Sequence, residues 1–235
     1  MAIRPVFCIY NRIPYVKVVS IEFTFHSGFA VSQKQKSYLS LQTNYLEKHP
    51  DSNILEISSK SMESLGVELS AFNLMIKTNQ REFSVESAFQ SSKVFEKGGP
   101  YTDILDKNAR EAKKDIRLKN SGKLISFQYF GRQYPLEPKD YFYNWLYINS
   151  LYLNKPLMQQ IVKYNSFTDI EFNPDKSINC QAKAIALFVS LYKEDLLEES
   201  LKSQENFLQI AYGIKTNKEN KMAFEQIDIN SLYKK

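Results

Sequence analysis

The sequence contains very few cysteines and histidines. Cys8 and Cys180 are the two cysteines, and His26 and His49 are the two histidines, among 235 residues. Two cysteines so far apart do not form a disulfide framework, so a cytoplasmic location is expected. Two histidines argue against a His-rich zinc site and against a Ser-His-Asp triad. We therefore predict a protein with no metal site and no cofactor.

Glycine is also scarce, and long apolar runs are missing. The seven glycines form no Gly-rich phosphate loop, so side chains and helix ends must hold any phosphate that binds. No run approaches the ~20 apolar residues of a membrane span, and the start, Met-Ala-Ile-Arg-Pro, lacks a signal-peptide pattern. We expect no association with a membrane.

The chain is rich in apolar and aromatic residues and carries a modest net positive charge. Hydrophobic residues make up 43% and aromatic residues 14%, which is enough for a real core and too much for disorder. The length suits one domain, or one domain with extensions. A net charge of +5 permits transient contact with a phosphate backbone, without the dense basic stripe of a dedicated DNA binder.

Alternating and helical patterns follow one another along the chain and predict an α+β protein. Strands are expected within 5–31, at 54–57, on both sides of Thr78-Asn79 and over 124–134. Helices are expected over 32–48, from Ser84 to Gly98, from 102 or 108 to 120, over 141–153, over 157–164, from 175 or 177 to 192, and after 194. Residues 203–235 are predicted to form a strap over the surface.

The helix predicted from Ser84 carries the most informative polar residues. Ser84 suits the N-cap, and Gly98-Gly99-Pro100 suit the helix end. At roughly 100° per residue, Glu86, Gln90 and Lys93 fall within an arc of roughly 60° beside a buried stripe. An acid, an amide and an amine would then line a pocket wall. The alternative is a first-turn glutamate favoured by the helix dipole, with a solvated glutamine and lysine.

Three lysines in the first quarter of the chain are candidates for phosphate binding. Lys34, Lys36 and Lys60 stand beside several serines, and lysine is a compact charge for phosphate oxygens. They would form a cationic rim for a diphosphate. The alternative is three solvated lysines, as most lysines are.

A basic face is predicted on the helix that ends near Asn120. Arg110, Lys113, Lys114 and Arg117 follow i, i+3, i+4, i+7 spacing, which places them on one side. The alternative is a solvated face balanced by neighbouring acids.

Two short motifs resemble the opening of the NADAR family. Leu69-Ser-Ala-Phe-Asn73 is similar to its Leu-Ser-Asn-Phe-like turn, and Glu86-x-x-x-Gln90-x-x-Lys93 is similar to the helix that follows. A closer resemblance, over about the first 190 residues, is to the NADAR antitoxins paired with DarT-type DNA ADP-ribosyltransferases. The stretches that carry it are Gly28–Lys36, Leu55–Lys60, Phe95–Tyr101 and Phe167–Pro174.

The resemblance implies a fold and a domain organisation. It implies a mostly helical orthogonal fold, to which the N-terminal strands add a β-rich extension. We expect residues 1–66 to form that extension, 67–193 the catalytic core, and 194–235 a C-terminal helix and strap, all within one compact domain.

The resemblance also implies site residues. Glu86, Lys93 and Asp169 would be catalytic, although Glu171 competes with Asp169 because Glu171-Phe172 replaces the family's tryptophan-glycine pair. Lys93 could anchor a ribose hydroxyl or phosphate, or attack the anomeric carbon and form a Schiff base. The residues expected to bind ADP-ribose or the base are Lys34, Lys36, Lys60, Asn73, Gln90, Lys114, Arg117, Trp145, Glu171 and Asn179. Trp145 would stack on a nucleobase, although its helical spacing also suits a core residue.

The function implied is hydrolysis of the N-glycosidic bond of ADP-ribosylated guanine in DNA. ADP-ribose would be the product, and the reaction would reverse a DarT-type toxin. Because a base inside a duplex is inaccessible, the DNA should be single-stranded or the base flipped out. The alternatives are an N-glycosidase of a small nucleotide or flavin precursor, and a non-enzymatic antitoxin that binds its toxin.

Overall fold

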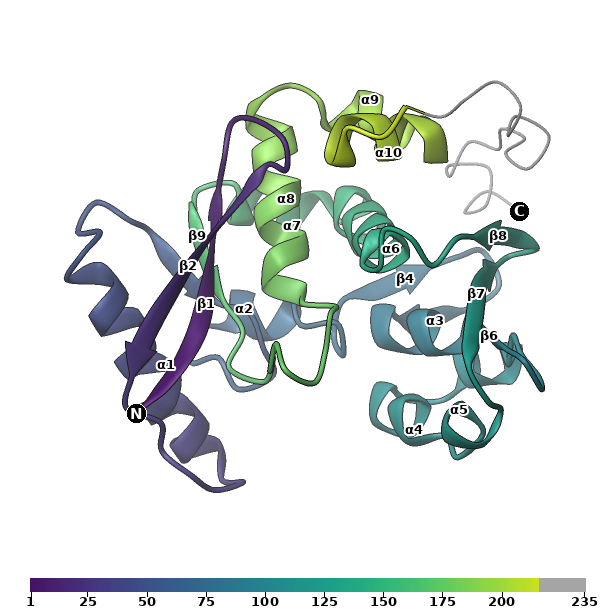
Figure 1. Ribbon diagram of the computed structural model, residues 1–235, viewed down its shortest axis with the longest axis horizontal. Coiled ribbons are helices and arrows are strands. Elements are labelled where there is room, and N and C mark those ends of the chain that lie inside the picture. The colour runs from purple at the N-terminus through teal and green to yellow at the C-terminus, as the bar shows by residue number, and fades with distance from the viewer. Residues whose placement is uncertain (216–235) are drawn as a thin grey trace.

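A four-stranded sheet unites segments that are far apart in the sequence. In the computed structural model, which describes residues 1–215, β1 (Ala2–Ile9) and β2 (Val16–Phe23) pair as an antiparallel hairpin along their full lengths (Figure 1). The strand order is β2-β1-β9-β3, with β3 at Ile54–Glu56 and β9 at Ser166–Thr168. β9 runs antiparallel to β1 and parallel to β3. The loop that follows β9 is therefore anchored on strands from the first quarter of the chain.

Apolar clusters lie on both faces of this sheet. α1 (Val31–Leu46) packs on one face, where Tyr38 joins Val6 of β1 in a small cluster. The next residue, Phe7, belongs to the main core, to which α8 (Gln181–Lys193) also contributes. Since successive side chains of a strand point to opposite faces, β1 supports both clusters.

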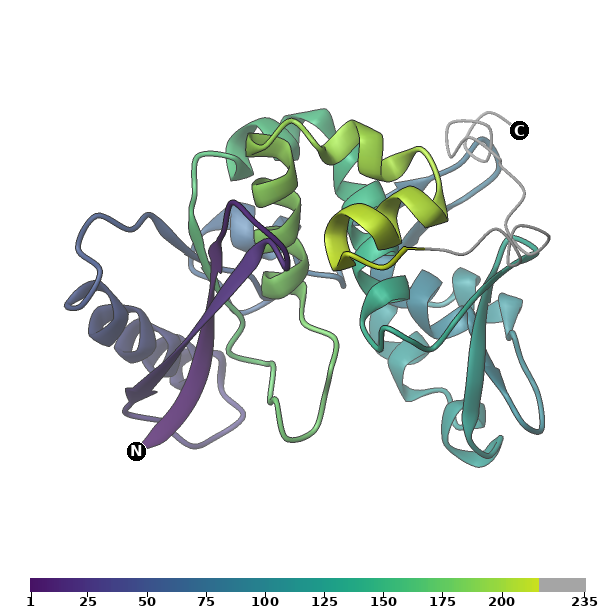
Figure 2. The same cartoon turned by 45° about the horizontal axis from the view of Figure 1, so that its top comes forward.

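Two long helices occupy the middle of the molecule. α6 (Tyr141–Leu153) and α8 pack against each other, and every residue of α6 from Tyr141 to Leu151 is buried. Figures 1 and 2 show the sheet with α1 at one end of the molecule and α3–α5 with β6–β8 at the other. The loop between β9 and α8 projects between these two ends in both views. The shorter helices around this centre are α2 (Ser64–Glu68), α7 (Lys155–Ile161), α9 (Leu197–Leu201) and α10 (Gln204–Tyr212).

Short elements at the second end surround α3 (Val85–Ser91). The hairpin of β4 (Met75–Lys77) and β5 (Glu82–Ser84) leads directly into α3. The Oγ of Ser84 accepts a hydrogen bond of 3.0 Å from the backbone N–H of Ser87, as expected of an N-cap. A three-stranded antiparallel sheet then contains β6 (Lys93–Phe95), β7 (Leu124–Tyr129) and β8 (Arg132–Tyr134). Between β6 and β7 lie the 3-10 helix η1 (Thr102–Asp106), α4 (Ala109–Lys114) and α5 (Arg117–Asn120).

The α+β class, the hairpin at Thr78-Asn79 and the helix over 141–153 are confirmed. The predicted end of the first site helix at Gly98 is wrong. α3 ends at Ser91, and Lys93 already belongs to β6, because strand pairing with β7 takes the backbone out of the helix. The predicted continuous helix to Asn120 is also wrong, because Asp115 adopts ψ of 125° and separates α4 from α5.

The C-terminal strap is corrected in part. Residues 204–212 form α10, in which Phe207 and Leu208 are buried, and residues 216–235 lie outside the described residues. The predicted division at residues 66 and 193 stays a prediction, and β9 lies between two strands of the first segment. Within residues 1–215, no helix combines the length and the apolar character needed to span a bilayer.

Candidate active site

A pocket of about 800 Å³ lies where α3, α4 and the 69–73 turn face the loop after β9. Eight of the residues proposed from the sequence line it: Lys60, Asn73, Glu86, Gln90, Lys93, Asp169, Glu171 and Asn179. Five others do not: Lys34, Lys36, Lys114, Arg117 and Trp145. The pocket therefore brings together residues that are more than 100 positions apart.

A chain of polar contacts follows the α3 wall. The Nζ of Lys93 donates to Oε1 of Gln90 at 2.7 Å, and the Nε2 of Gln90 donates to Oε1 of Glu86 at 2.9 Å. The same Glu86 oxygen is 3.8 Å from the Nζ of Lys113, which comes from α4. Gln90 thus uses both ends of its amide, so that it fixes the acid and the amine relative to each other.

Lys93 has an altered acidity. Burial lowers the pKa of Lys93 to about 8, the charge of Glu86 partly opposes this, and the charge of Lys113 lowers it further. Its Nζ also lies 4.9 Å from the ring centroid of Phe89. An amine with a pKa near 8 is partly uncharged at neutral pH, as an amine nucleophile requires.

Asp169 provides a second carboxyl group of different character. It is 9% exposed, and its Oδ1 accepts backbone N–H bonds from Glu171 at 3.0 Å and Phe172 at 3.2 Å. Burial raises the pKa of Asp169 well above its ordinary value, and the nearby carboxylate of Glu56 raises it further. Glu56 is itself buried and accepts a hydrogen bond of 2.6 Å from Thr168. The two backbone N–H bonds to Asp169 oppose this rise, but burial prevails, so Asp169 holds a proton more readily than an exposed aspartate.

Glu171 lies in a different environment from Asp169. Its side chain is 43% exposed and lies 3.4 Å from the Nζ of Lys34, at the N-terminal part of α1. Glu171 is thus a residue of the pocket rim that is paired with a cation. Lys34 reaches the rim only through this pair, while Lys36 is exposed on α1.

Two side chains that were not proposed from the sequence hold the 69–73 turn in place. Gln181 accepts from the backbone N–H of Ala71 at 2.8 Å and donates to the carbonyl of Ile57 at 2.7 Å. The hydroxyl of Tyr147 donates to the carbonyl of Leu69. The 69–73 turn also positions α3, because the carbonyl of Ala71 accepts a hydrogen bond of 2.9 Å from the backbone N–H of Glu86. Gln181 also lines the pocket.

The pocket lining is more cationic than anionic. Three carboxyl groups line it, those of Glu86, Asp169 and Glu171. The basic residues that line it are Lys60, Lys93, Arg110, Lys113 and Lys176. This balance favours an anionic ligand such as a diphosphate.

Trp145 is a core residue. It is 3% exposed, and its ring packs against Tyr134 at 4.9 Å and Tyr129 at 6.5 Å between centroids. It is absent from the pocket lining, whereas Tyr143, two positions earlier on α6, lines it. The prediction of Trp145 as a stacking platform is corrected, because α6 directs this position into the aromatic core.

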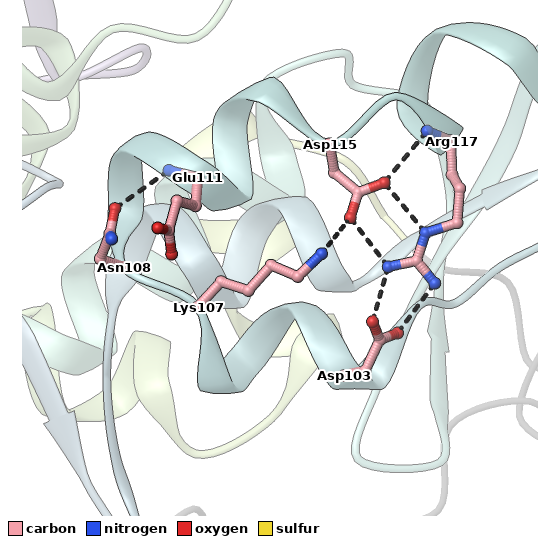
Figure 3. A network of polar contacts seen from close by, with 6 residues as sticks. All are labelled: Asp103, Lys107, Asn108, Glu111, Asp115 and Arg117. Atoms are coloured by element: carbon pink, nitrogen blue, oxygen red, sulfur yellow. Dashed lines mark hydrogen bonds and ion pairs between the residues drawn. The ribbon is translucent and has the colours of Figure 1, made fainter.

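Arg117 is engaged in an ion-pair network outside the pocket. Figure 3 shows its guanidinium between Asp103 and Asp115, with Lys107 on the far side of Asp115. The shortest contacts are 2.6 Å to Asp103, 2.8 Å to Asp115 and 2.6 Å from Lys107 to Asp115. Hydrogen bonds from Arg117 and Lys107 hold the pKa of Asp115 well below its usual range. The predicted continuous basic face is wrong, because the chain turns at Asp115.

Sequence reasoning missed several residues of the lining. Arg110 and Lys113 belonged to the predicted basic face, but helical spacing alone did not separate them from Lys114 and Arg117. Tyr143 carried no polar signal within an apolar helix. Phe72 stands within the recognised turn, and its ring lies 5.3 Å from the Nζ of Lys113.

Glu86, Gln90 and Lys93 thus line one wall of a cavity in an α+β chain. The family model of the DarT1-associated NADAR antitoxin matches residues 2–221. The chain therefore belongs to the DarT1-associated NADAR antitoxin family. A comparison with curated proteins found no match.

Proposed function

We propose that the protein is an antitoxin glycohydrolase that cleaves the N-glycosidic bond between ADP-ribose and guanine in DNA. The observation that carries the proposal is one pocket that holds Glu86, Lys93 and a buried Asp169 among cationic side chains. A pocket of about 800 Å³ is of the size that accepts a ligand like ADP-ribose.

The two carboxyl groups suit opposite tasks in such a reaction. Positive charge develops on the ribose as the base departs, and a carboxylate nearby stabilises it. Glu86 accepts a hydrogen bond from Gln90, and its Oε1 lies 3.8 Å from the Nζ of Lys113, so we assign it this task. Asp169, with its raised pKa, carries the proton that the departing guanine needs. Two groups whose environments differ in this way form an acid–base pair.

We assign Lys93 the role of nucleophile. Its uncharged amine attacks C1″, the C1″–N bond breaks, and the electron pair leaves with guanine, which receives the proton of Asp169. Glu86 takes a proton from the attacking nitrogen. The ribose ring then opens as Glu86 returns that proton to O4″, which leaves a protonated Schiff base on Lys93. Water hydrolyses the Schiff base, which releases ADP-ribose, regenerates the amine of Lys93 and returns a proton to Asp169. A pKa of about 8 leaves about a quarter of the amine uncharged at pH 7.5.

The other cations of the pocket suit the diphosphate. Lys60 follows β3, Lys176 lies in the loop between β9 and α8, and Arg110 and Lys113 come from α4. Lysine and arginine are the usual partners of phosphate oxygens.

The test is incubation with an oligonucleotide that carries ADP-ribosylated guanine, with release of free ADP-ribose as the readout. We expect turnover by the wild type and a loss of about 100-fold or more in Glu86→Gln, which removes charge and keeps volume. Glu82→Gln is the matched control, since Glu82 is an exposed carboxylate on β5 that pairs with Lys77. Equal turnover in Glu86→Gln and wild type would remove Glu86 from the mechanism.

A cellular assay separates the enzymatic role from the alternatives. Co-expression should protect cells from a guanine-modifying DarT-type toxin, and Glu86→Gln should fail to protect. Equal protection by both proteins would indicate an antitoxin that works by binding its toxin. Release of a base from a small nucleotide, with none from the oligonucleotide, would indicate a metabolite N-glycosidase.

A further inference from the structure

The outer side of α4 continues the basic lining of the pocket onto the surface. Lys113 and Arg110 line the pocket, and Arg110 also lines an adjoining open depression of about 470 Å³. Lys114, Lys107 and Glu111 complete the lining of that depression. Arg110 therefore connects the two cavities.

The order of these residues around α4 follows from helix geometry. At roughly 100° per residue, Lys113 lies about 60° to one side of Arg110 and Lys114 about 40° to the other. The buried Ala109 and Ala112 fix the opposite side of the helix to the protein. The side chains thus form a row that leads from the pocket, through Arg110, to Lys114.

The ion-pair network in Figure 3 determines which of these cations are available. Lys107 is paired with Asp115, so it contributes little free charge to the depression. Within residues 1–215, neither Arg110 nor Lys114 forms an ion pair. Asn108 caps α4 through bonds of 3.1 and 3.0 Å to the N–H groups of Arg110 and Glu111, which fixes the orientation of the row.

We propose that Arg110 and Lys114 hold backbone phosphates of the DNA strand that flanks the modified guanine, so that the strand leaves the pocket across α4. This inference rests on the proposed function for the identity of the substrate. A base that enters the pocket brings its strand to the rim, and α4 offers the strand unpaired cations there. These contacts add affinity without reading sequence.

The experiment compares two substrates. One is ADP-ribosylated guanosine without a strand, and the other is a single-stranded oligonucleotide that carries the same adduct. Lys114→Ala should leave kcat/KM for the nucleoside unchanged, because Lys114 does not line the pocket. For the oligonucleotide, KM should rise while kcat stays constant, and Lys114→Glu should raise KM more than Lys114→Ala. Lys17→Ala, which removes the same charge from the exposed surface of β2, should behave like the wild type.

The salt dependence of oligonucleotide binding gives the size of the effect expected for Lys114→Ala. One lost phosphate contact lowers the slope of log affinity against log salt by about 0.7 for a single strand. Between 50 and 200 mM salt, the wild type should therefore lose affinity about threefold more than Lys114→Ala. An equal slope in both proteins would overturn the proposal. A Lys114→Ala protein that loses as much activity on the nucleoside as on the oligonucleotide would also overturn it.

A binding measurement keeps the proposal separate from the proposed function. If the wild type hydrolyses neither substrate, the hydrolase assignment fails. Fluorescence anisotropy with an unmodified single-stranded oligonucleotide then decides the role of α4. Weaker binding by Lys114→Glu than by wild type and Lys17→Glu would support the strand path, and equal binding by all three would refute it.

Discussion

The acidity of Lys93 leads to a specific dependence of the rate on pH. Its pKa of about 8 arises mainly from burial. If the uncharged amine attacks, the rate follows the uncharged fraction, which is about 1% at pH 6 and about 50% at pH 8. The single-turnover rate should therefore rise about 50-fold over this interval and level off above pH 8. The nucleoside adduct is the preferred substrate, because it removes any pH dependence of DNA binding.

Variants of Lys93 and of its neighbour Lys113 test whether Lys93 is the nucleophile. The charge of Lys113 lowers the pKa of Lys93, so Lys113→Ala should move the inflection of the pH profile upward. Borohydride should trap a covalent adduct of ADP-ribose with the wild type, and the adduct should be absent from Lys93→Ala and Lys93→Arg, since a guanidinium does not form the imine. Lys97→Ala, at an exposed position just after β6, is the control.

A different pH profile would refute the role of Lys93 as the nucleophile. A rate that is flat from pH 6 to 8 and falls above pH 8 would mean that the charged ammonium is the active form. Lys93 would then anchor a ribose hydroxyl or a phosphate, Lys93→Arg would retain more activity than Lys93→Ala, and no adduct would form. Water would attack C1″ directly in that case.

Three further predictions concern the site and its support. Asp169→Asn should reduce turnover by about 100-fold or more, whereas Glu171→Gln, at the exposed rim, should cost less than about tenfold in the same assay; an equal loss would contradict the assignment of the acid. Trp145→Phe should keep the KM for the nucleoside and lower the free energy of unfolding in urea by about 1–2 kcal/mol, because Trp145 fills the core; a raised KM at unchanged stability would restore it as a stacking platform. Asp115→Asn should cost about 2 kcal/mol of unfolding free energy at pH 7, and the exposed Asp106→Asn less than about 0.5 kcal/mol. The pKa of Asp115 is lowered in the folded state, so its contribution to the free energy of unfolding is present above the unfolded pKa of about 3.9 and is lost as pH falls below that value. The wild type and Asp115→Asn should therefore have similar free energies of unfolding in acid.

Local sequence determined the elements whose signals lie within a few residues. The cap at Ser84, the hairpin around Thr78-Asn79 and the apolar helix over 141–153 depend on short-range hydrogen bonds and periodicity. The Glu86, Gln90 and Lys93 set was recognisable because its members stand within eight residues, and all three line the pocket. The hydrogen bond from Gln90 to Glu86 follows from their i, i+4 spacing on α3.

Tertiary structure decided what local spacing does not contain. Lys93 leaves the helix because β6 pairs with β7, a partner about 30 positions later, and this pairing places the amine where burial lowers its pKa. Asp169 becomes a buried acid because β9 inserts between β1 and β3 and brings Glu56 beside it. The break at Asp115 assigns Arg117 to an ion-pair network and leaves Arg110 and Lys113 at the pocket. Two of these outcomes depend on strand pairing between residues that are distant in sequence, and the third depends on a network of ion pairs. Such contacts leave no periodic pattern in the sequence, so they could not be predicted from it.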